Sequence, residues 1–423
     1  MIDSDLLQLV NTHPHQTAVI IGGGAAGIFA AIQVKEKNPS LHVIVLEKSA
    51  VFLSKVRISG GGRCNVTHSC FDPQQLVKFY PRGFKELLGP FHTFQPKDTI
   101  SWYEERGALL KVEKDGRMFP TTNQSQTIIN TLMQEVSRLG IHLVGCEPAT
   151  AISKEEDLFH IQLKNERLLL CRSIMLATGS SSQGLLLAES LGHSLEKSVP
   201  SLFTFNLPSA SLLHLSGVSV PHARVSLPHM KQSYEGPLLI THFGLSGPAV
   251  LKLSAWSAKE LYAAEYKTEV RVNWAPHLTL EEVKEDLFKW KKKKPSTTVE
   301  LLALYDLPKS LWKHLTQPWE GKILSHLSLK DMELLSQRAC QDTYQMEGKT
   351  THKEEFVTCG GVKLNEVNFK TMESKKTPGL FFGGEVLNID GITGGFNFQN
   401  AWTTGYIAGL SMACSVREKS LGE

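Results

Sequence analysis

The chain has 423 residues, a formal net charge of +3, 41% hydrophobic residues and 21% charged residues. This length suits two or three domains, and the composition suits a globular protein with a sizeable core. The charge is too small to indicate nucleic-acid binding by itself. The N-terminal MIDSDLLQLVNTHPHQ lacks the apolar run of a signal peptide, so we expect no secretion.

The seven cysteines include no CxxC pair. Their odd number and scattered positions argue against a disulfide framework and a zinc site, so we expect no bound metal. Two long charge-free stretches, 198–223 and 391–416, contain prolines or amide and hydroxyl side chains that are poorly suited to a membrane span. We therefore expect a soluble cytoplasmic protein without a membrane partner.

The first predicted unit is a strand, a helix and a second strand. The β-branched run 17–21 predicts a buried strand, the Ala-rich run 25–35 predicts a helix, and 41–46 predicts the next strand. Together they form a strand–helix–strand unit of the kind found in dinucleotide-binding proteins.

The turn between the first strand and the helix is GGGAAG. Gly22 allows a tight turn, Gly24 lets the backbone approach a pyrophosphate, and Gly27 lets the helix pack closely on the sheet. The phosphates would then face the positive end of the helix dipole. Glu47 ends the second strand, where its carboxylate can accept hydrogen bonds from ribose hydroxyls. An acidic residue there favours FAD or NAD over NADP.

A second glycine-rich segment, KVRISGGGRCN at 55–65, lies within a stretch, 50–70, that we predict to be a loop. Three consecutive glycines allow the backbone to pass very close to a ligand. The flanking cations Lys55, Arg57 and Arg63 suit an anionic, planar partner. A generic surface loop is the alternative interpretation.

Further elements lead to a third feature, the strand exit Ala177-Thr178-Gly179, whose small residues permit close approach of a dinucleotide. The patterns before it predict helices near 73–88, 97–105 and 126–139, and strands near 141–146, 149–153, 159–163, 168–170 and 173–177.

The pattern then changes twice. Short apolar runs with Pro, Gly and Ser predict a β-rich insert, and helical periodicity with capping-box spacing from Thr279 predicts a helical subdomain. The run Lys289–Lys294 is interpreted as a solvated helix end, with a phosphate contact as the alternative. We expect an FAD-binding domain over 1–197 and 363–423, a β-rich insert over 198–275, a helical subdomain over 276–345, and a return strand of the insert over 346–362.

The last segment predicts a buried strand and a tight turn at 379–385, followed by GITGGFN and a helix with Ala401, Gly405 and Ala408 on a close-packing face. A helix N-terminus at such a turn presents free N–H groups and a positive dipole end. Placed beside a flavin, it would stabilise the anionic reduced form. A helix-capping turn without a ligand is the alternative.

Four segments, GGGAAG, ISGGGRCNVT, THFGLSGPAVL and GLFFGGEVLNIDGITGGFNFQNAW, resemble the BaiN/YhiN-like, or aminoacetone oxidase-like, family of FAD flavoproteins. The resemblance implies an α/β fold with a split Rossmann-type FAD-binding domain, an inserted β-barrel-like domain and a small helical domain. It also implies that the segments 59–65 and 394–397 flank the flavin ring system.

We therefore expect an FAD-dependent oxidoreductase that transfers hydride between flavin N5 and a small organic substrate. The chain contains no second GxGxxG with strand context, so NAD(P)H would visit as a transient reductant. One alternative is an amine oxidase whose substrate reduces the flavin. The other is a flavin-bound binding or regulatory protein with weak nucleic-acid contact.

Three residues are candidates for chemistry: Cys64, Arg57 and His242. Cys64 could act as a redox thiol or only pack against the cofactor, Arg57 could bind substrate or FAD, and His242 could act from the insert or be structural. The predicted cofactor-binding residues are Gly22, Gly24, Ala25, Ala26, Gly27, Glu47, Lys48, Lys55, Ser59, Gly60, Gly61, Gly62, Arg63, Cys64, Asn65, Ala177, Thr178, Gly179, Gly384, Glu385, Gly394, Gly395, Phe396 and Asn397.

Overall fold

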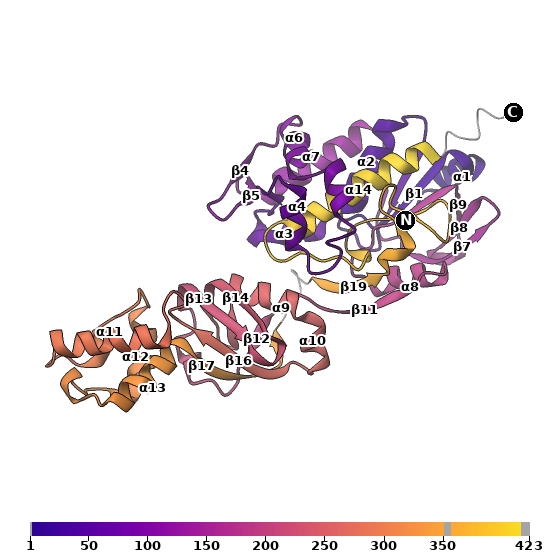
Figure 1. The fold of residues 1–423 in the computed structure, drawn as a ribbon. Coiled ribbons are helices and arrows are strands. Elements are labelled where there is room, and N and C mark those ends of the chain that lie inside the picture. The colour runs from indigo at the N-terminus through magenta and orange to yellow at the C-terminus, as the bar shows by residue number, and fades with distance from the viewer. Residues whose placement is uncertain (1, 351–356, 416–423) are drawn as a thin grey trace. The chain divides into compact units, whose positions relative to one another are not determined.

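The structure is a computed structural model that describes residues 2–350 and 357–415 (Figure 1). Two compact units make up the chain. The first combines Met1–Val199 with Lys353–Glu423, and the second is the continuous segment Pro200–His352.

A seven-stranded sheet forms the centre of the first unit, in the order β20-β21-β22-β10-β1-β2-β6. The five strands from β22 to β6 run parallel, and β20 and β21 add an antiparallel edge. Every residue of β1 is buried, as expected for a parallel sheet covered on both faces. The predicted Rossmann-type α/β fold is therefore confirmed. The bounds are β1 Thr17–Ile21, β2 His42–Leu46, β6 His142–Val144, β10 Ser173–Leu176, β20 Val367–Asn368, β21 Glu373–Ser374 and β22 Leu380–Phe382.

Helices α2 (Ala25–Lys37) and α14 (Phe396–Ser415) lie against each other in the first unit, and Figure 1 shows the yellow α14 beside α2. A Cβ added at Gly405 would lie 2.6 Å from the carbonyl oxygen of Ala26. A Cβ added at Gly409 would lie 2.6 Å from that of Ala30. Glycine is required at both positions because backbone atoms of the neighbouring helix occupy that space. The close-packing role predicted for Gly405 is confirmed.

The helix predicted near 73–88 is wrong. The structure has α4 (Pro73–Leu76), a 3₁₀ turn, and α5 (Leu88–Thr93) instead. Pro81 explains the break, because the residue before a proline is driven to extended backbone, and Tyr80 has φ −113° and ψ 103°.

Three small sheets and several further helices complete the first unit. The strand orders of these sheets are β3-β5-β4, β7-β8-β9 and β11-β19. The predictions near 97–105, 126–139, 149–153 and 159–163 are confirmed within a few residues. The bounds are α1 Ser4–Thr12, α3 Ser54–Gly62, β3 Thr67–His68, α6 Pro96–Glu104, β4 Leu110–Val112, β5 Arg117–Pro120, α7 Ser125–Arg138, β7 Ala149–Glu155, β8 Leu158–Leu163, β9 Leu168–Cys171, α8 Ser182–Ser190, β11 Leu195–Pro200 and β19 Thr358–Val362.

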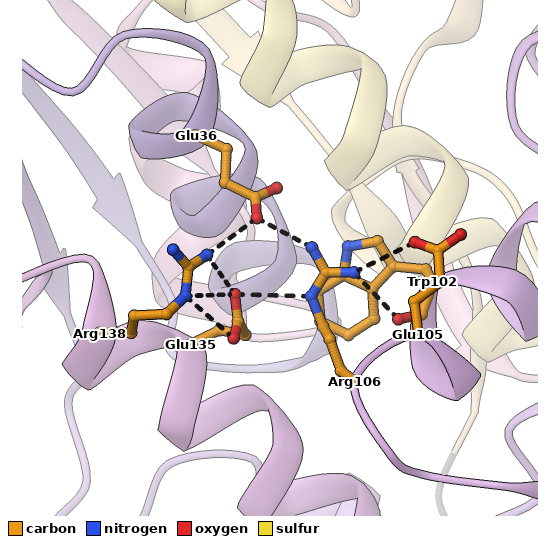
Figure 2. A network of polar contacts seen from close by, with 6 residues as sticks. All are labelled: Glu36, Trp102, Glu105, Arg106, Glu135 and Arg138. Atoms are coloured by element: carbon orange, nitrogen blue, oxygen red, sulfur yellow. Dashed lines mark hydrogen bonds and ion pairs between the residues drawn. The ribbon is translucent and has the colours of Figure 1, made fainter.

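A polar network ties α2, α6 and α7 together at the surface (Figure 2). Arg106 stacks on the ring of Trp102 at 4.1 Å and donates to Glu36 at 2.9 Å. Arg138 donates to the same Glu36 at 3.2 Å and to Glu135 at 2.5 Å. The two arginines thus share Glu36, which links helices that are distant in the sequence.

The second unit is built on an antiparallel sheet in the order β17-β16-β13-β14-β15-β12-β18. Strand β12 also contacts β17, so the sheet curls towards a barrel. The β-rich character predicted for this segment is confirmed, although helices α9 and α10 within it were not foreseen. The bounds are β12 Thr204–Asn206, β13 Ser219–Leu227, β14 Gln232–Ile240, β15 Gly244–Ser246, α9 Pro248–Trp256, α10 Ala258–Ala263, β16 Lys267–Asn273, β17 Asp342–Glu347 and β18 Lys349–Thr350.

Three helices follow β16: α11 (Leu280–Lys293), α12 (Lys309–Thr316) and α13 (Leu329–Cys340). Their buried side chains belong to the same hydrophobic cluster as those of the sheet, so helices and sheet share one core. The predicted capping box at Thr279 is present. The Thr279 backbone N–H donates a hydrogen bond to the Glu282 carboxylate at 2.7 Å.

The return strand expected within 346–362 is placed differently by the structure. Strands β17 and β18 do return to the sheet of the second unit, but β19 pairs with β11 in the first unit. Among the described helices, none is long and apolar enough to span a bilayer.

His193 and Glu366 form a pair beside β21 and β22, in which the His193 side chain is fully buried and contacts Ser374 and Phe382. The His193 Nδ1 atom lies 3.1 Å from Glu366 Oε2, and Lys376 donates to Glu366 Oε1 at 2.7 Å. Burial alone would raise the pKa of Glu366, but hydrogen bonds from Lys376 and Ser194 outweigh it and lower the pKa to about 2. The charged carboxylate is therefore favoured in the folded state.

We predict that Glu366→Gln lowers the free energy of unfolding by roughly 2–3 kcal/mol at neutral pH. Because the folded pKa is depressed from 4.5 to about 2, this contribution is present above pH 4.5 and is lost as the pH falls towards 2. Urea denaturation at several pH values measures it. A difference between variant and wild type that stays constant down to acidic pH would contradict the prediction.

We predict that Gly405→Ala destabilises the protein by about 1–3 kcal/mol, because the added methyl group meets the Ala26 backbone. The matched control is Gly89→Ala in α5, where an added Cβ meets no atom within 4 Å. The control should be neutral or slightly stabilising. Equal unfolding midpoints for both variants would contradict the close packing of α14 on α2.

Candidate functional site

The turn between β1 and α2 has the geometry of a dinucleotide-binding turn. Gly22 has φ +113°, and its Cβ would lie 2.4 Å from the Ala177 carbonyl oxygen. A Cβ at Gly27 would lie 2.0 Å from the carbonyl oxygen of Gly22. Gly24 differs, since its Cβ would meet no atom within 4 Å. The chain thus packs tightly around two of the glycines and leaves space open at the third.

The N-terminus of α2 begins at this open space. Gly24 is the N-cap, and no side chain caps the helix. Uncapped N–H groups at a helix N-terminus bind anions, and the dipole adds to their attraction. Ala25 and Ala26 are the first residues of the helix, so their N–H groups are placed to meet a pyrophosphate.

Glu47 lies beside the glycine turn at the end of β2. Its Oε2 atom accepts a hydrogen bond from the Gly23 N–H at 2.9 Å, and its Oε1 atom accepts one from the Ser49 N–H at 2.9 Å. These bonds hold the carboxylate next to the turn, where an adenosine ribose is bound in Rossmann folds. Lys48 is exposed and lies 3.3 Å from Ser181.

The segment 50–70 contains a helix, α3, so the predicted loop is wrong for its first half. The helix breaks at Ser59, and Gly60 and Gly61 follow with φ +58° and +67°, in the left-handed region that glycine favours. A Cβ at Gly61 or Gly62 would meet no atom within 4 Å. The glycines therefore expose bare backbone, as a segment in contact with a flat ligand requires.

The cations of this segment are held by protein groups. Arg63 lies over the ring of Phe119 at 4.1 Å and donates to Glu113 at 2.7 Å. Arg57 is exposed and donates to Gln126 at 2.8 Å. These contacts anchor the two guanidinium groups towards Glu113, β5 and α7.

Cys64 is fully buried with φ +61°. Burial raises the pKa of its thiol to about 12, although a hydrogen bond with Ser59 acts in the opposite direction. A thiol with this pKa is protonated at neutral pH and is a poor nucleophile. The environment of Cys64 favours the packing role over the redox role.

The structure brings the two predicted flavin-flanking segments together. We assign the orientation of the Asn65 amide from its neighbours, because only one orientation places donors against acceptors. In that orientation the side-chain oxygen accepts a hydrogen bond from the Gly395 N–H at 2.9 Å, and the amide nitrogen donates to the Thr67 carbonyl at 3.1 Å. A Cβ at Gly395 would lie 2.5 Å from that Thr67 oxygen. Asn65 therefore joins the glycine-rich segment to the turn before α14.

The turn from 390 to 397 is closed by its own side chains. Asn397 exchanges two hydrogen bonds with the Gly391 backbone, at 2.8 and 2.9 Å. The buried Asp390 carboxylate is bound by the Arg82 guanidinium, at 2.5 Å for the Nε–Oδ1 pair. Phe396 is 2% exposed and stacks on Phe79. Because its ring is buried in protein, a contact between Phe396 and a cofactor would come from its backbone.

A second group of predicted residues surrounds the end of β10. Lys55 and Glu385 form an ion pair at 2.5 Å. Gly179 has φ +59°, and its Cβ would lie 3.6 Å from the Glu385 carboxylate. The other oxygen of Glu385, Oε1, is buried with no hydrogen-bond partner among the described residues. An orphaned carboxylate oxygen beside a glycine turn fits a hydroxyl donor from a bound ligand.

His242 lies in the second unit. It is an exposed residue of the turn between β14 and β15, which the Thr241 hydroxyl closes through a hydrogen bond from the Gly244 N–H at 3.2 Å. A catalytic role for His242 stays a prediction.

Sequence reasoning missed the buried polar network around α14. Gln399 accepts hydrogen bonds from the hydroxyls of Thr67 and Thr99 at 2.6 and 3.0 Å, and it donates to Thr403 at 3.0 Å. Trp402 donates to the Val66 carbonyl at 3.0 Å. The available signal was the amide and hydroxyl residues within a charge-free stretch beside close-packing glycines.

Together these features fit FAD. The open space at Gly24, the uncapped α2 N-terminus and the Glu47 carboxylate suit its ADP half. The bare backbone at Gly61 and Gly62 and the turn joined to it by Asn65 suit the flavin half. All of these residues belong to the first unit.

Comparisons with known proteins agree with this geometry. Residues 16–411 match the HI0933-like protein Rossmann domain. The 3-dehydro-bile acid delta(4,6)-reductase of Clostridium scindens is 28% identical over 93% of this chain and 98% of its own length. The ribosomal RNA dihydrouridine synthase of Escherichia coli is 29% identical over 92% of this chain and 96% of its own length. The enzyme of that name from Haemophilus influenzae is 28% identical over 93% of this chain and 98% of its own length.

Solved structures share the fold at low sequence identity. The 3-ketosteroid delta1-dehydrogenase of Sterolibacterium denitrificans has a TM-score of 0.51 and 11% identity, covering 95% of this chain and 100% of that one. FrdA of Escherichia coli quinol fumarate reductase has a TM-score of 0.50 and 14% identity, covering 96% of this chain and 70% of that one.

We predict that Gly24→Ala lowers FAD affinity by about tenfold or more, since its methyl group enters the space left for the pyrophosphate. Stability of the apoprotein should change by less than about 1 kcal/mol, because this methyl group meets no protein atom. Flavin retained through purification and the apoprotein melting temperature measure the two effects. Gly27→Ala is the contrasting variant and should lose both flavin binding and apoprotein stability, because its methyl group meets the Gly22 backbone. Unchanged flavin binding by Gly24→Ala would refute the placement of the pyrophosphate at Gly24.

Proposed function

The chain belongs to the HI0933-like protein Rossmann-domain family, and from that premise we propose that it reduces a carbon–carbon double bond conjugated to a carbonyl group. Family membership and the curated relatives make it an FAD-dependent oxidoreductase, as the sequence motifs predicted. The proposal concerns the finer points: the substrate class, the hydride transfer and the source of electrons.

The names of the relatives support this substrate class. A delta(4,6)-reductase of a 3-dehydro-bile acid saturates a double bond in conjugation with a ketone. A dihydrouridine synthase saturates the double bond of uracil that is conjugated to a carbonyl. The two substrates differ in size and polarity, but the reacting group is of one kind. We infer the same reacting group for the substrate of this chain.

The net reaction we propose consumes NAD(P)H and a proton. Hydride from NAD(P)H reaches one carbon of the double bond and a solvent proton reaches the other, so the substrate gains two hydrogen atoms and NAD(P)H becomes NAD(P)⁺. When bound, FAD supplies hydride transfer at its N5 atom.

The residues of the chain position and polarise this site. Gly61 and Gly62 leave backbone bare for contact with the ring system. Asn65 holds the turn that precedes α14, and the N-terminus of that helix offers N–H groups and a positive dipole end. Such a group stabilises negative charge that develops on reduction. The close contact of Gly395 with the 65–67 segment is the observation that carries the proposal, because it unites two segments some 330 residues apart at one point. A Cβ added at Gly395 would lie 2.5 Å from the Thr67 carbonyl oxygen.

An RNA substrate is a second candidate, favoured by the names of the two dihydrouridine synthases. The sequence alone gave nucleic acid little support because the net charge is only +3. A free conjugated ketone and a uridine within RNA would present the same reacting group, so the two candidates differ in what surrounds it.

We predict that NADPH or NADH bleaches the flavin absorbance near ~450 nm under anaerobic conditions, and that a conjugated ketone restores it. Stopped-flow spectroscopy on the holoprotein measures both steps. A saturated ketone of the same skeleton is the control and should not restore the absorbance. Bleaching by amines in place of NAD(P)H would support the amine oxidase alternative and refute the proposal.

A further inference from the structure

The C-terminal end of α11 carries an unusual set of side chains, which we call the lysine–aromatic cluster: Phe288, Trp290, Lys292, Lys293 and Lys294. Lys292 lies 4.8 Å from the centre of the Phe288 ring. Lys293 and Lys294 lie 5.1 and 5.3 Å from that of Trp290. Cations and aromatic rings thus alternate over the last turn and a half of the helix.

The other two lysines of the run have protein partners. Lys289 pairs with Asp286 at 2.9 Å, and Lys291 donates to the Leu327 carbonyl at 2.6 Å. Within residues 2–350 and 357–415, no ion pair involves Lys292, Lys293 or Lys294, and all three are exposed. These three cations are therefore available to an external anion.

The helix dipole explains part of this arrangement. Glu281 and Glu282 lie in the first turn of α11 and lysines lie in the last, so the charges complement the dipole. The dipole does not explain why an aromatic ring accompanies them at the surface. Phe288 is 42% exposed, whereas Val283 and Leu287 on the core side of the same helix are fully buried.

A cavity at the other end of α11 shows the contrast. It has a volume of about 450 Å³, and its lining includes Arg224, Arg271 and Thr279. Both arginines are already paired, Arg224 with Glu235 and Arg271 with Glu269. The cavity thus offers little unpaired positive charge, in contrast to the lysine–aromatic cluster.

We infer that the lysine–aromatic cluster is a docking surface for single-stranded RNA. Lysines neutralise backbone phosphates, and an exposed aromatic ring stacks on an unpaired base. Trp290 is half-buried against the core of the second unit, so its ring is held in place beneath Lys293 and Lys294. An anionic membrane surface would use the lysines as well, but a single exposed ring offers little area for insertion, whereas it matches the face of one base.

This inference rests on the proposed function only in its choice of RNA as the partner, which follows the second candidate substrate. The cluster would hold the RNA, and the flavin site of the first unit would act on a base. Docking and chemistry are then separable, because a small conjugated ketone needs the flavin site alone.

The test is binding of a fluorescent single-stranded oligouridine RNA to the full-length flavin-loaded protein, measured by anisotropy at several salt concentrations. The triple variant Lys292→Glu, Lys293→Glu and Lys294→Glu should bind at least about tenfold more weakly. The slope of the logarithm of the binding constant against the logarithm of the salt concentration should become shallower by about 2. This is expected for the loss of three phosphate contacts, each of which contributes roughly 0.7 to the slope on a single strand. Phe288→Ala should weaken binding about fivefold or more and leave the salt dependence unchanged.

The matched control is Lys37→Glu, Lys164→Glu and Lys370→Glu, three exposed lysines of the first unit with the same total change in charge. It should bind RNA like the wild type. A second variant with glutamine at positions 292–294 guards against a folding defect from reversed charge at the helix end, and flavin content and melting temperature are measured for each protein.

Three results would overturn the inference: a wild type that does not bind the RNA, a cluster variant that binds as well as the control, or binding to vesicles of anionic lipid without binding to RNA. Reduction of the conjugated ketone should be equal in wild type and cluster variants. Failure of that reduction in the wild type would count against the proposed function and leave the docking result standing.

Discussion

The contact between α2 and α14 is the constraint on which the rest of the first unit depends. The two helices come from opposite ends of the chain, and they approach so closely that backbone atoms of α2 fill the space beside Gly405 and Gly409. The N-terminus of α2 faces the dinucleotide turn and the N-terminus of α14 faces the Asn65 bond. Their packing therefore sets the distance between the two halves of the cofactor site that we propose.

Directional bonds fix how α14 is turned about its axis. The close contacts at Gly405 and Gly409 alone would let α14 slide or rotate against α2, because van der Waals contacts have little directional preference. The bonds of Gln399 to Thr67 and of Trp402 to Val66 are lost if the helix rotates, and each would leave a buried polar group without a partner. The Thr404 hydroxyl adds a bond from the Gly384 N–H at 2.8 Å. Apolar contact brings the helix close, and polar contact sets its orientation.

The sequence predicted those parts of the site that are local in the chain. The glycine turn and Glu47 follow from a strand, a helix and the next strand, so their spacing in the sequence is their spacing in the fold. The bond between Asn65 and Gly395 and the ion pair between Arg82 and Asp390 join residues more than 300 positions apart, and no local pattern marks them.

Two other features depended on tertiary contacts in the same way. The burial of Cys64 follows from what packs over it, so its thiol could be named from the sequence but its raised pKa could not. The helix in the first half of 50–70 was missed because the glycines suggested a loop, whereas residues before Ser59 are helical and the glycines come at the end of the helix.

The order of the strands has a consequence for synthesis of the protein on the ribosome. The second unit is one continuous segment with its own core, so it can fold as soon as it has emerged. Strand β10 must wait, because its neighbour β22 is made about 200 residues later. Until then the edge of β10 is open to pairing with other chains. The nascent protein therefore passes through a stage in which it holds a folded insert and an unfinished sheet, and the cofactor site that we propose is complete only after α14 has been made.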